Sequence, residues 1–208
     1  MINVIIRNIK KEDLYEVECV AKKAFWNLNM PGCDEHYTIH RLWKNDAYIP
    51  ELSMLAENDG KIIGAILYAK ATIQTSSTEL ETLTFAPLCV DPCFQKQGIG
   101  KHLLKKSMEK ARTLGFGSIL IYGVPTYYPK YGFGTADKFG IQTPNGTNFD
   151  AFMGIELIKG SLSGVNGKFY EPSVYCVDVH DANYIAEVDR FDKAFPYMEK
   201  KILPRQWR

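Results

Sequence analysis

Apolar residues in the first part of the chain follow two periods, that of a strand and that of a helix. Residues 11–25 show the helical period, with Glu12 and Asp13 in the first turn, where the helix dipole favours acids. Asn58-Asp59-Gly60 separates two apolar runs and predicts a hairpin turn. The pattern predicts a strand at 3–9, helices at 11–25 and about 35–44, and strands at 52–57 and 61–73.

The middle of the chain predicts a long amphipathic helix, 97–114, between strands at 82–90 and 118–122. Gly115 ends this helix. Beyond residue 157, glycines mark turns, and the pattern is compatible with a strand at 173–179 and a helix at 181–195. We expect one domain at 1–157 and a C-terminal extension at 158–208 packed on it. The extension could cover a cleft, extend the sheet or form a dimer contact.

A loop with two glycines opens the long helix, within the segment 90–101. The first N–H groups of a helix have no intrahelical partners, and the helix dipole adds partial positive charge there. Gly98 and Gly100 lack a Cβ, so an anion can approach the main chain closely. The segment therefore predicts a pyrophosphate-binding loop.

The spacing of the loop excludes two common phosphate-binding motifs. A Walker loop needs Ser or Thr after Gly-Lys, but His102 follows Gly100-Lys101. A dinucleotide fingerprint needs a third glycine where Leu103 stands. What remains is Gln-x-x-Gly-x-Gly, which resembles the phosphate-binding motif of the GNAT superfamily of acyl-CoA N-acetyltransferases. The matching positions are Val90, Pro92, Gln95, Gly98, Ile99, Gly100, Leu103 and Leu104.

A second stretch extends the resemblance. GNAT proteins often carry Phe-Tyr-x-x-x-Gly-Phe on a short helix followed by a strand, and residues 127–133 read Tyr-Tyr-Pro-Lys-Tyr-Gly-Phe. The segments 123–133 and 169–172 are similar to a YhbS-like bacterial branch of the superfamily. The resemblance implies an α/β (α+β) fold: a mixed, mostly antiparallel twisted sheet with helices on both faces and a splayed pair of parallel strands.

The resemblance also implies a reaction, the direct transfer of an acetyl group from acetyl-CoA to a primary amine of a small molecule, peptide or protein. Acetyl-CoA is the expected co-substrate, and no metal is expected. A backbone N–H of Cys89 or Val90 would polarise the thioester carbonyl. The residues expected to bind the cofactor are Leu88, Cys89, Val90, Gln95, Lys96, Gln97, Gly98, Ile99, Gly100, Lys101 and Tyr128.

Two residues are expected to carry out the proton transfers. Tyr128 matches the family tyrosine that protonates the departing thiolate, and a phenol with a pKa of ~10 is protonated at neutral pH. Tyr128 could instead only pack against the cofactor. Glu81 is the candidate general base on the strand before the loop, with an exposed carboxylate as its alternative role.

The segment 33–40 is dense in reactive side chains and lies where GNAT proteins often shape the acceptor site. Glu35, His36 and His40 are therefore expected to bind the substrate. Plain packing, with Asp34 capping the second helix, is the alternative. A zinc site formed by Cys33, His36 and His40 lacks a fourth ligand.

Composition narrows the class of protein. The chain has 208 residues and a formal net charge of +1, which gives no reason to expect nucleic-acid or membrane-surface binding. Five scattered cysteines indicate reduced thiols in the cytoplasm, and a homodimer is expected from the family. The alternatives to an enzyme are a non-catalytic acyl-CoA-binding sensor or interaction module, or a nucleotide-binding protein of another fold, whose motifs are missing.

Overall fold

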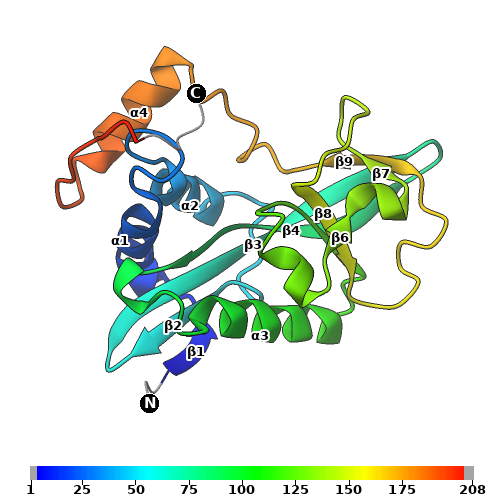
Figure 1. Cartoon of the computed structure of the whole chain (residues 1–208), viewed down its shortest axis with the longest axis horizontal. Helices are drawn as coiled ribbons and strands as arrows, with labels where there is room; N and C mark the ends of the chain where they lie inside the picture. The colour runs from blue at the N-terminus through cyan, green and yellow to red at the C-terminus, as the bar shows by residue number, and fades with distance from the viewer. Residues whose placement is uncertain (1–3, 204–208) are drawn as a thin grey trace.

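One twisted sheet organises the chain (Figure 1). The computed structural model describes residues 4–203, and within them the sheet has nine strands, in the order β1-β2-β3-β4-β5-β8-β6, with β9 paired to β3 and β7. Residues 1–3 and 204–208 lie outside the described part. They include residue 3 of the expected strand 3–9, the start of the expected domain 1–157 and the end of the expected extension 158–208. The strands are β1 (Val4–Asn8), β2 (Met54–Asn58), β3 (Lys61–Thr75), β4 (Glu79–Val90), β5 (Ser118–Tyr122), β6 (Gly134–Thr135), β7 (Ile141–Gln142), β8 (Phe152–Glu156) and β9 (Gly167–Tyr170).

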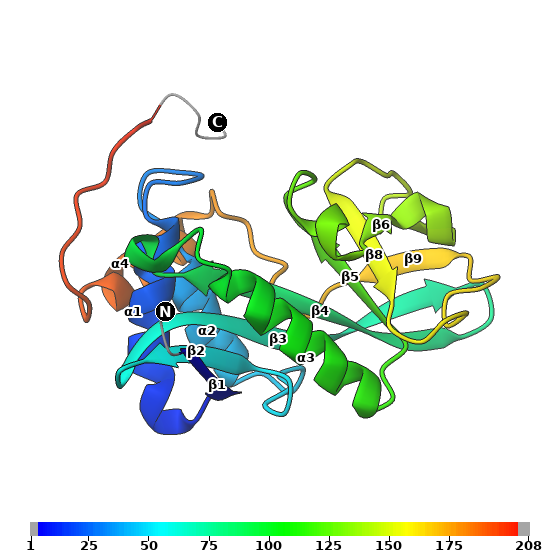
Figure 2. The same ribbon diagram turned by 60° about the horizontal axis from the view of Figure 1, so that its bottom comes forward.

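Helices cover both faces of this sheet (Figure 2). The α-helices are α1 (Leu14–Phe25), α2 (Glu35–Trp43), α3 (Ile99–Thr113) and α4 (Ala182–Asp192). Short 3-10 helices are η1 (Lys11–Asp13), η2 (Pro92–Phe94), η3 (Tyr128–Tyr131) and η4 (Ala136–Phe139). The predicted mixed sheet with helices on two faces is confirmed.

Residues of the central strands build three hydrophobic clusters, and the two largest lie on opposite faces of the sheet because alternate side chains point to opposite sides. Ile66 and Tyr68 of β3 pack with the apolar side of α3, while Leu67 and Ala69 pack with α1 and α2. β3 is therefore buried along most of its length, which explains its nearly continuous apolar sequence.

β4 and β5 are parallel, as are β7 and β9, and β4 and β5 separate soon after they meet. Their register contains one pair, Leu83 with Ile119. The hydroxyls of Thr82 and Ser118 lie 2.7 Å apart at the closed end. Every other neighbouring pair along the path from β1 to β6 is antiparallel. The open side of this pair forms the site considered below.

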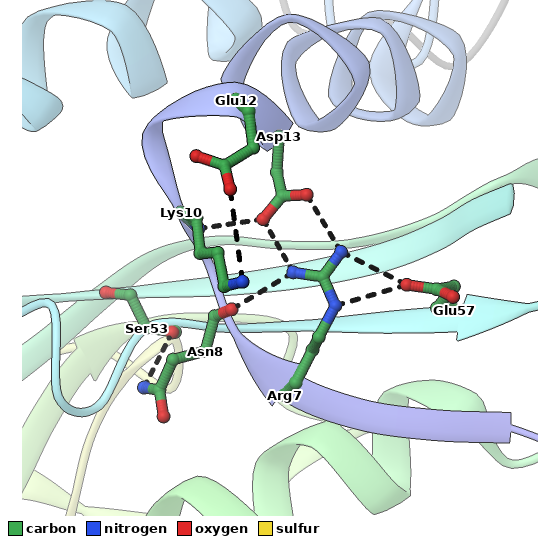
Figure 3. Close-up of polar contacts among 7 residues, drawn as sticks. All are labelled: Arg7, Asn8, Lys10, Glu12, Asp13, Ser53 and Glu57. Atoms are coloured by element: carbon green, nitrogen blue, oxygen red, sulfur yellow. Dashed lines mark hydrogen bonds and ion pairs between the residues drawn. The ribbon is translucent and has the colours of Figure 1, made fainter. Parts of the chain in front are cut away.

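Arg7 on β1 holds together the first elements of the chain (Figure 3). Its guanidinium donates to both carboxylate oxygens of Asp13, at 2.6 and 2.8 Å, and its Nε donates to Glu57 on β2 at 3.1 Å. Asp13 also accepts the N–H of Lys10. This network fixes the entry into α1, and the arginine lowers the pKa of Asp13.

The C-terminal residues join the same sheet and the same helical layer. β9 pairs with β3 over Thr72–Thr75, and α4 lies against α2 on the other side of the molecule (Figure 1). The expected strand at 173–179 is wrong, because residues 173–175 form a turn and no strand follows them up to α4. The outer edge of β3 pairs with β2, with the bridge at Tyr48 and with β9, so this edge is not available to residues 173–179.

Candidate active site

A cleft of about 1330 Å³ lies where β4 and β5 diverge. Its walls come from β4, the end of β5, the start of α3, η3 and the segment that joins α1 to α2. A smaller hollow of about 620 Å³ lies beside β7 and β9 and contains none of the residues expected to bind a cofactor. The large cleft is therefore the candidate site.

The glycine loop forms one end of the cleft. Gly98 is the N-cap of α3 with a φ of +85°, a conformation that favours glycine, and apart from its own chain neighbours no atom lies within 4 Å of where its Cβ would be. Lys96 before it also has a positive φ, of 61°. The first N–H groups of α3 have no partner within the helix, and Gly98, Ile99 and Gly100 line the cleft together with Lys96 and Lys101. The arrangement suits a polyanion.

Two glutamines support this loop. The amide of Gln95 donates to the carbonyl of Val90 at 3.1 Å, and Gln95 also lines the cleft. Gln97 is exposed and its amide donates to the carbonyl of Cys93 at 3.4 Å. Gln97 is absent from the cleft lining, so its side chain fixes the loop from outside.

The open edge of β4 forms the floor. The N–H of Asp91 donates to Ile63 on β3, and alternate residues of a strand point the same way, so the N–H of Cys89 also faces β3. The N–H groups of Leu88 and Val90 face the opposite edge, where β5 has diverged. Both residues line the cleft, whereas the Cys89 side chain is buried under α1 and α2, and burial raises the pKa of its thiol to about 12.

Tyr128 stands on η3 over this floor. Its ring packs against Phe85 and Phe133, with centroids 5.8 and 5.5 Å away. The end of β5 accommodates it through Gly123, where a Cβ would lie 2.5 Å from the tyrosine ring. Burial, followed by the charge of Tyr131, raises the pKa of Tyr128, so its phenol is protonated over the whole neutral range.

Glu81 lies elsewhere on β4. Its carboxylate pairs with Lys70 at 3.3 Å, both side chains are about half exposed, and Glu81 is absent from the cleft lining. The acids in the lining are Glu35 and Asp150. Glu35 begins α2, and burial, followed by the charge of Asp34, raises the pKa of Glu35 to about 7.

The two histidines next to Glu35 face away from the cleft. His36 is fully buried, with its Nε2 atom 3.2 Å from Asp192 on α4 and its Nδ1 atom 3.6 Å from the sulfur of Cys33. His40 lies 3.1 Å from Glu18 and 2.8 Å from Lys44. Burial lowers the pKa of both imidazoles. Within residues 4–203 there is no group of three or more His, Cys, Asp or Glu side chains placed to hold a metal.

Asp34 does not cap α2 with its side chain. Its carboxylate instead accepts a hydrogen bond from the hydroxyl of Tyr184 on α4, at 2.8 Å. The segment 33–40 is thus divided, with Glu35 towards the cleft and its neighbours towards α1 and α4.

Sequence reasoning missed several lining residues, among them Tyr122, Phe149 and Asp150. Tyr122 ends β5, and ligands commonly bind at the carboxyl end of a parallel strand, so its position at the strand end could have identified it as a site residue. Phe149 and Asp150 lie in an irregular segment before β8, where no periodic pattern marks them.

Comparisons with known proteins agree on one family. The profile of the acetyltransferase (GNAT) family matches residues 19–133. The uncharacterized N-acetyltransferase YjhQ of Escherichia coli (strain K12) is 35% identical over 123 residues, which is 59% of this chain and 65%, just under two thirds, of YjhQ. The uncharacterized N-acetyltransferase YhbS of the same strain is 23% identical over 129 residues, 62% of this chain and 75% of YhbS.

Two solved structures share the fold. The GNAT family N-acetyltransferase YhbS from Escherichia coli, in complex with CoA, has a TM-score of 0.75 and 19% identity. The match covers 85% of this chain and 94% of the YhbS chain. A GNAT family acetyltransferase from Brucella melitensis, in complex with acetyl-CoA, has a TM-score of 0.68 and 20% identity. The match covers 84% of this chain and 99% of the Brucella melitensis chain.

Proposed function

This chain belongs to the acetyltransferase (GNAT) family, and we propose that it transfers the acetyl group of acetyl-CoA directly to a primary amine. The observation that carries the proposal is the presence in one cleft of the glycine loop, the open edge of β4 and the phenol of Tyr128. The complexes of the YhbS and Brucella melitensis proteins with CoA and acetyl-CoA support the choice of co-substrate.

The two ends of the cofactor would use different parts of the cleft. The N–H groups at the start of α3, from Gly98 to Lys101, would hold the pyrophosphate, with Lys96 and Lys101 adding positive charge. The pantetheine arm would lie along the open edge of β4 like an added strand, because the N–H groups of Leu88 and Val90 face that edge.

The transfer would proceed through a tetrahedral intermediate. The amine nitrogen forms a bond to the thioester carbonyl carbon, and the N–H of Val90 stabilises the resulting oxyanion. When the intermediate collapses, the C–S bond breaks and Tyr128 donates its proton to the departing thiolate. The products are the N-acetylated amine and CoA.

The amine must also lose a proton to a base. Glu81 does not line the cleft, so we propose instead that the base is one of the two acids that do, Glu35 or Asp150.

The Tyr128→Phe variant tests this function. In thermal unfolding, acetyl-CoA should stabilise wild type and variant alike, whereas ATP and NAD should not, because only a ligand of the folded state raises the midpoint. Thiol release with a panel of amines should be ~100-fold slower or more in the variant. No stabilisation by millimolar acetyl-CoA would refute the function. Binding with equal thiol release in both proteins would refute the role of Tyr128, and binding with no turnover of any amine would favour a non-catalytic acyl-CoA-binding module.

We further propose that the protein acts in the cytoplasm. All five of its cysteines are free thiols, two of them buried, as expected in a reducing compartment. No helix within residues 4–203 is long and apolar enough to cross a membrane.

A further inference from the structure

One wall of the cleft carries a stacked pair of exposed aromatic rings. Tyr122 and Phe149 have ring centroids 5.8 Å apart and planes within 10° of each other. Tyr122 is 41% exposed and Phe149 is 50% exposed, although both line the cleft. The ring of Phe152 also packs against Tyr122, with the two ring centroids 5.0 Å apart. Apolar surface is thus exposed on a wall of the cleft, where burial by a ligand would be favourable.

The charges of the cleft are separated along its length. The positive groups in the lining are Lys96 and Lys101, both at the glycine loop, where the phosphates are proposed to bind. The negative groups are Glu35, at the start of α2, and Asp150, next to Phe149. A second ligand that binds away from the phosphates therefore meets carboxylates and aromatic rings.

Glu35 is well placed to meet a cation. It shares the cleft lining with Phe25 of α1 and with Pro87 and Leu88 of β4, beside the edge proposed for the thioester arm. The carboxylate of Asp34 and the thiol of Cys33 are among its neighbours, and within residues 4–203 Glu35 forms no ion pair. A partly buried carboxylate without a cationic neighbour gains most from a ligand that supplies the positive charge.

We propose that the acetyl acceptor is a primary amine on an apolar, preferably aromatic, body, with its ammonium group bound by Glu35 and its body by the Tyr122–Phe149 pair. The inference rests on the proposed transferase function and specifies its substrate class. A polyamine would require a row of carboxylates, and only two acids line the cleft within the described residues.

Glu35 also serves as the base in this arrangement. The ammonium passes one proton to the Glu35 carboxylate, and the neutral nitrogen then forms the C–N bond. Tyr128 supplies the proton that the CoA thiolate takes up, and the bonded nitrogen then loses its second proton, which restores the Tyr128 phenol. Glu35 returns its proton to solvent, so the reaction releases one proton overall at the pH where the free amine is charged. Because burial brings the pKa of Glu35 close to neutrality, both of its protonation states are accessible.

Calorimetric titration of amines into the CoA-saturated protein tests the inference separately from turnover. The probes are 2-phenylethylamine, ethanolamine and spermidine. We expect 2-phenylethylamine to bind at least ~10-fold more tightly than the other two, because only its ring can be buried on the aromatic pair. Phe149→Ala should remove this preference and leave ethanolamine binding unchanged. Tyr197→Ala, which removes an aromatic residue that is 88% exposed and outside the cleft lining, is the matched control.

Glu35→Gln should weaken the binding of all three amines without changing the affinity for CoA. Equal or tighter binding of ethanolamine or spermidine to the wild-type protein would overturn the inference, as would an unchanged preference in Phe149→Ala. Those results leave the transferase function intact. Failure of CoA and acetyl-CoA themselves to bind would instead remove the function on which the inference rests.

Discussion

The hydroxyl of Tyr175 donates a hydrogen bond to the main-chain carbonyl of Ala86, at 2.9 Å, across 89 positions of sequence. Ala86 and Pro87 lie in β4 where its register with β3 shifts, between the pairs Tyr68–Phe85 and Ile66–Leu88. Both residues line the cleft. The C-terminal extension therefore supplies a hydrogen bond to the irregular part of the strand that forms the cleft floor.

Tyr175→Phe should reduce both stability and acetyl-CoA binding. Loss of the hydroxyl leaves the Ala86 carbonyl without this partner, at a cost of about 1 kcal/mol, which lowers the unfolding midpoint by roughly 2–4 °C in a protein of this size. Thermal unfolding and calorimetry with acetyl-CoA measure the two effects. Tyr197→Phe, at an 88% exposed position, should change neither. An unaltered midpoint and affinity in Tyr175→Phe would show that the bond does not support the cleft.

Local patterns were enough to predict the parts of the fold that depend on neighbouring residues. The predicted helix 97–114 is α3, Ile99–Thr113, and the strand 118–122 has the same bounds in the structure. Periodicity and the glycine loop both act over a few residues, so they are visible in sequence. The glycine loop lies in the cleft because it joins β4 to α3, which are consecutive in the chain and both line the cleft.

Long-range relations could not be predicted in the same way. Glu35 is 52 residues from Pro87, yet both line the cleft, while Glu81 on the same strand as Pro87 does not. The strand expected at 173–179 fails for a similar reason, since a strand forms only where a sheet edge meets the segment, and residues 173–175 form a turn instead. These outcomes depend on which segments meet in space, which local preference does not determine.

Gly100→Ala should separate cofactor binding from stability. Gly100 is helical, so alanine is favoured by up to about 1 kcal/mol, and its Cβ would lie 3.1 Å from the hydroxyl of Tyr127, a contact that a small shift relieves. The unfolding midpoint should be unchanged or slightly higher. The methyl group would occupy the approach of the pyrophosphate, so acetyl-CoA affinity should fall at least ~10-fold.

The comparison variant for this prediction is Gly98→Ala. Its φ of +85° strains any residue with a Cβ, at a cost of about 1–2 kcal/mol, so it should lose stability as well as affinity. Undiminished acetyl-CoA affinity in Gly100→Ala would mean that the pyrophosphate does not lie over this part of the main chain.

Asp192→Asn should destabilise the contact between α4 and α1. The ammonium of Lys22 is 2% exposed and lies 2.6 Å from the Asp192 carboxylate. Removing one partner of a buried ion pair leaves an uncompensated charge and costs about 3 kcal/mol, the low end of the usual range, since Lys22 keeps a bond to the carbonyl of Pro196 at 2.9 Å. Urea unfolding at constant pH measures the loss.

The control for the ion pair lies on the same helix. Asp189 pairs with Lys200 at 2.7 Å, but both side chains are about half exposed, so Asp189→Asn should cost no more than about 1 kcal/mol. The double variant Lys22→Met/Asp192→Leu should recover much of the stability that Asp192→Asn loses. Equal effects of Asp192→Asn and Asp189→Asn would refute a distinct role for the buried pair.

The acetylation rate should rise with pH through an apparent pKa of about 7 that belongs to Glu35. Burial and Asp34 raise the pKa of Glu35 to about 7 from its ordinary value near 4.5, so the basic form is populated only above neutrality. Tyr128 stays protonated throughout this range, since the pKa of its phenol is raised by burial. Profiles of kcat/KM from pH 5.5 to 8.5 should show this rise in the wild-type protein and lose it in Glu35→Gln, with a rate ~100-fold lower at pH 8.

Stability gives an independent check on the same residue. A carboxyl whose folded pKa is raised stabilises the folded state below its unfolded pKa, near 4.5, and that contribution disappears as pH rises through 7. The unfolding midpoint of Glu35→Gln should therefore increase relative to wild type as the pH rises from 5 to 8.

Glu171 provides the control for this prediction. Burial raises the pKa of Glu171 to about 7 as well, but Glu171 is not in the cleft lining. Glu171→Gln should show the same trend in stability while keeping the rise in kcat/KM, and loss of that rise in Glu171→Gln alone would assign the catalytic titration to Glu171.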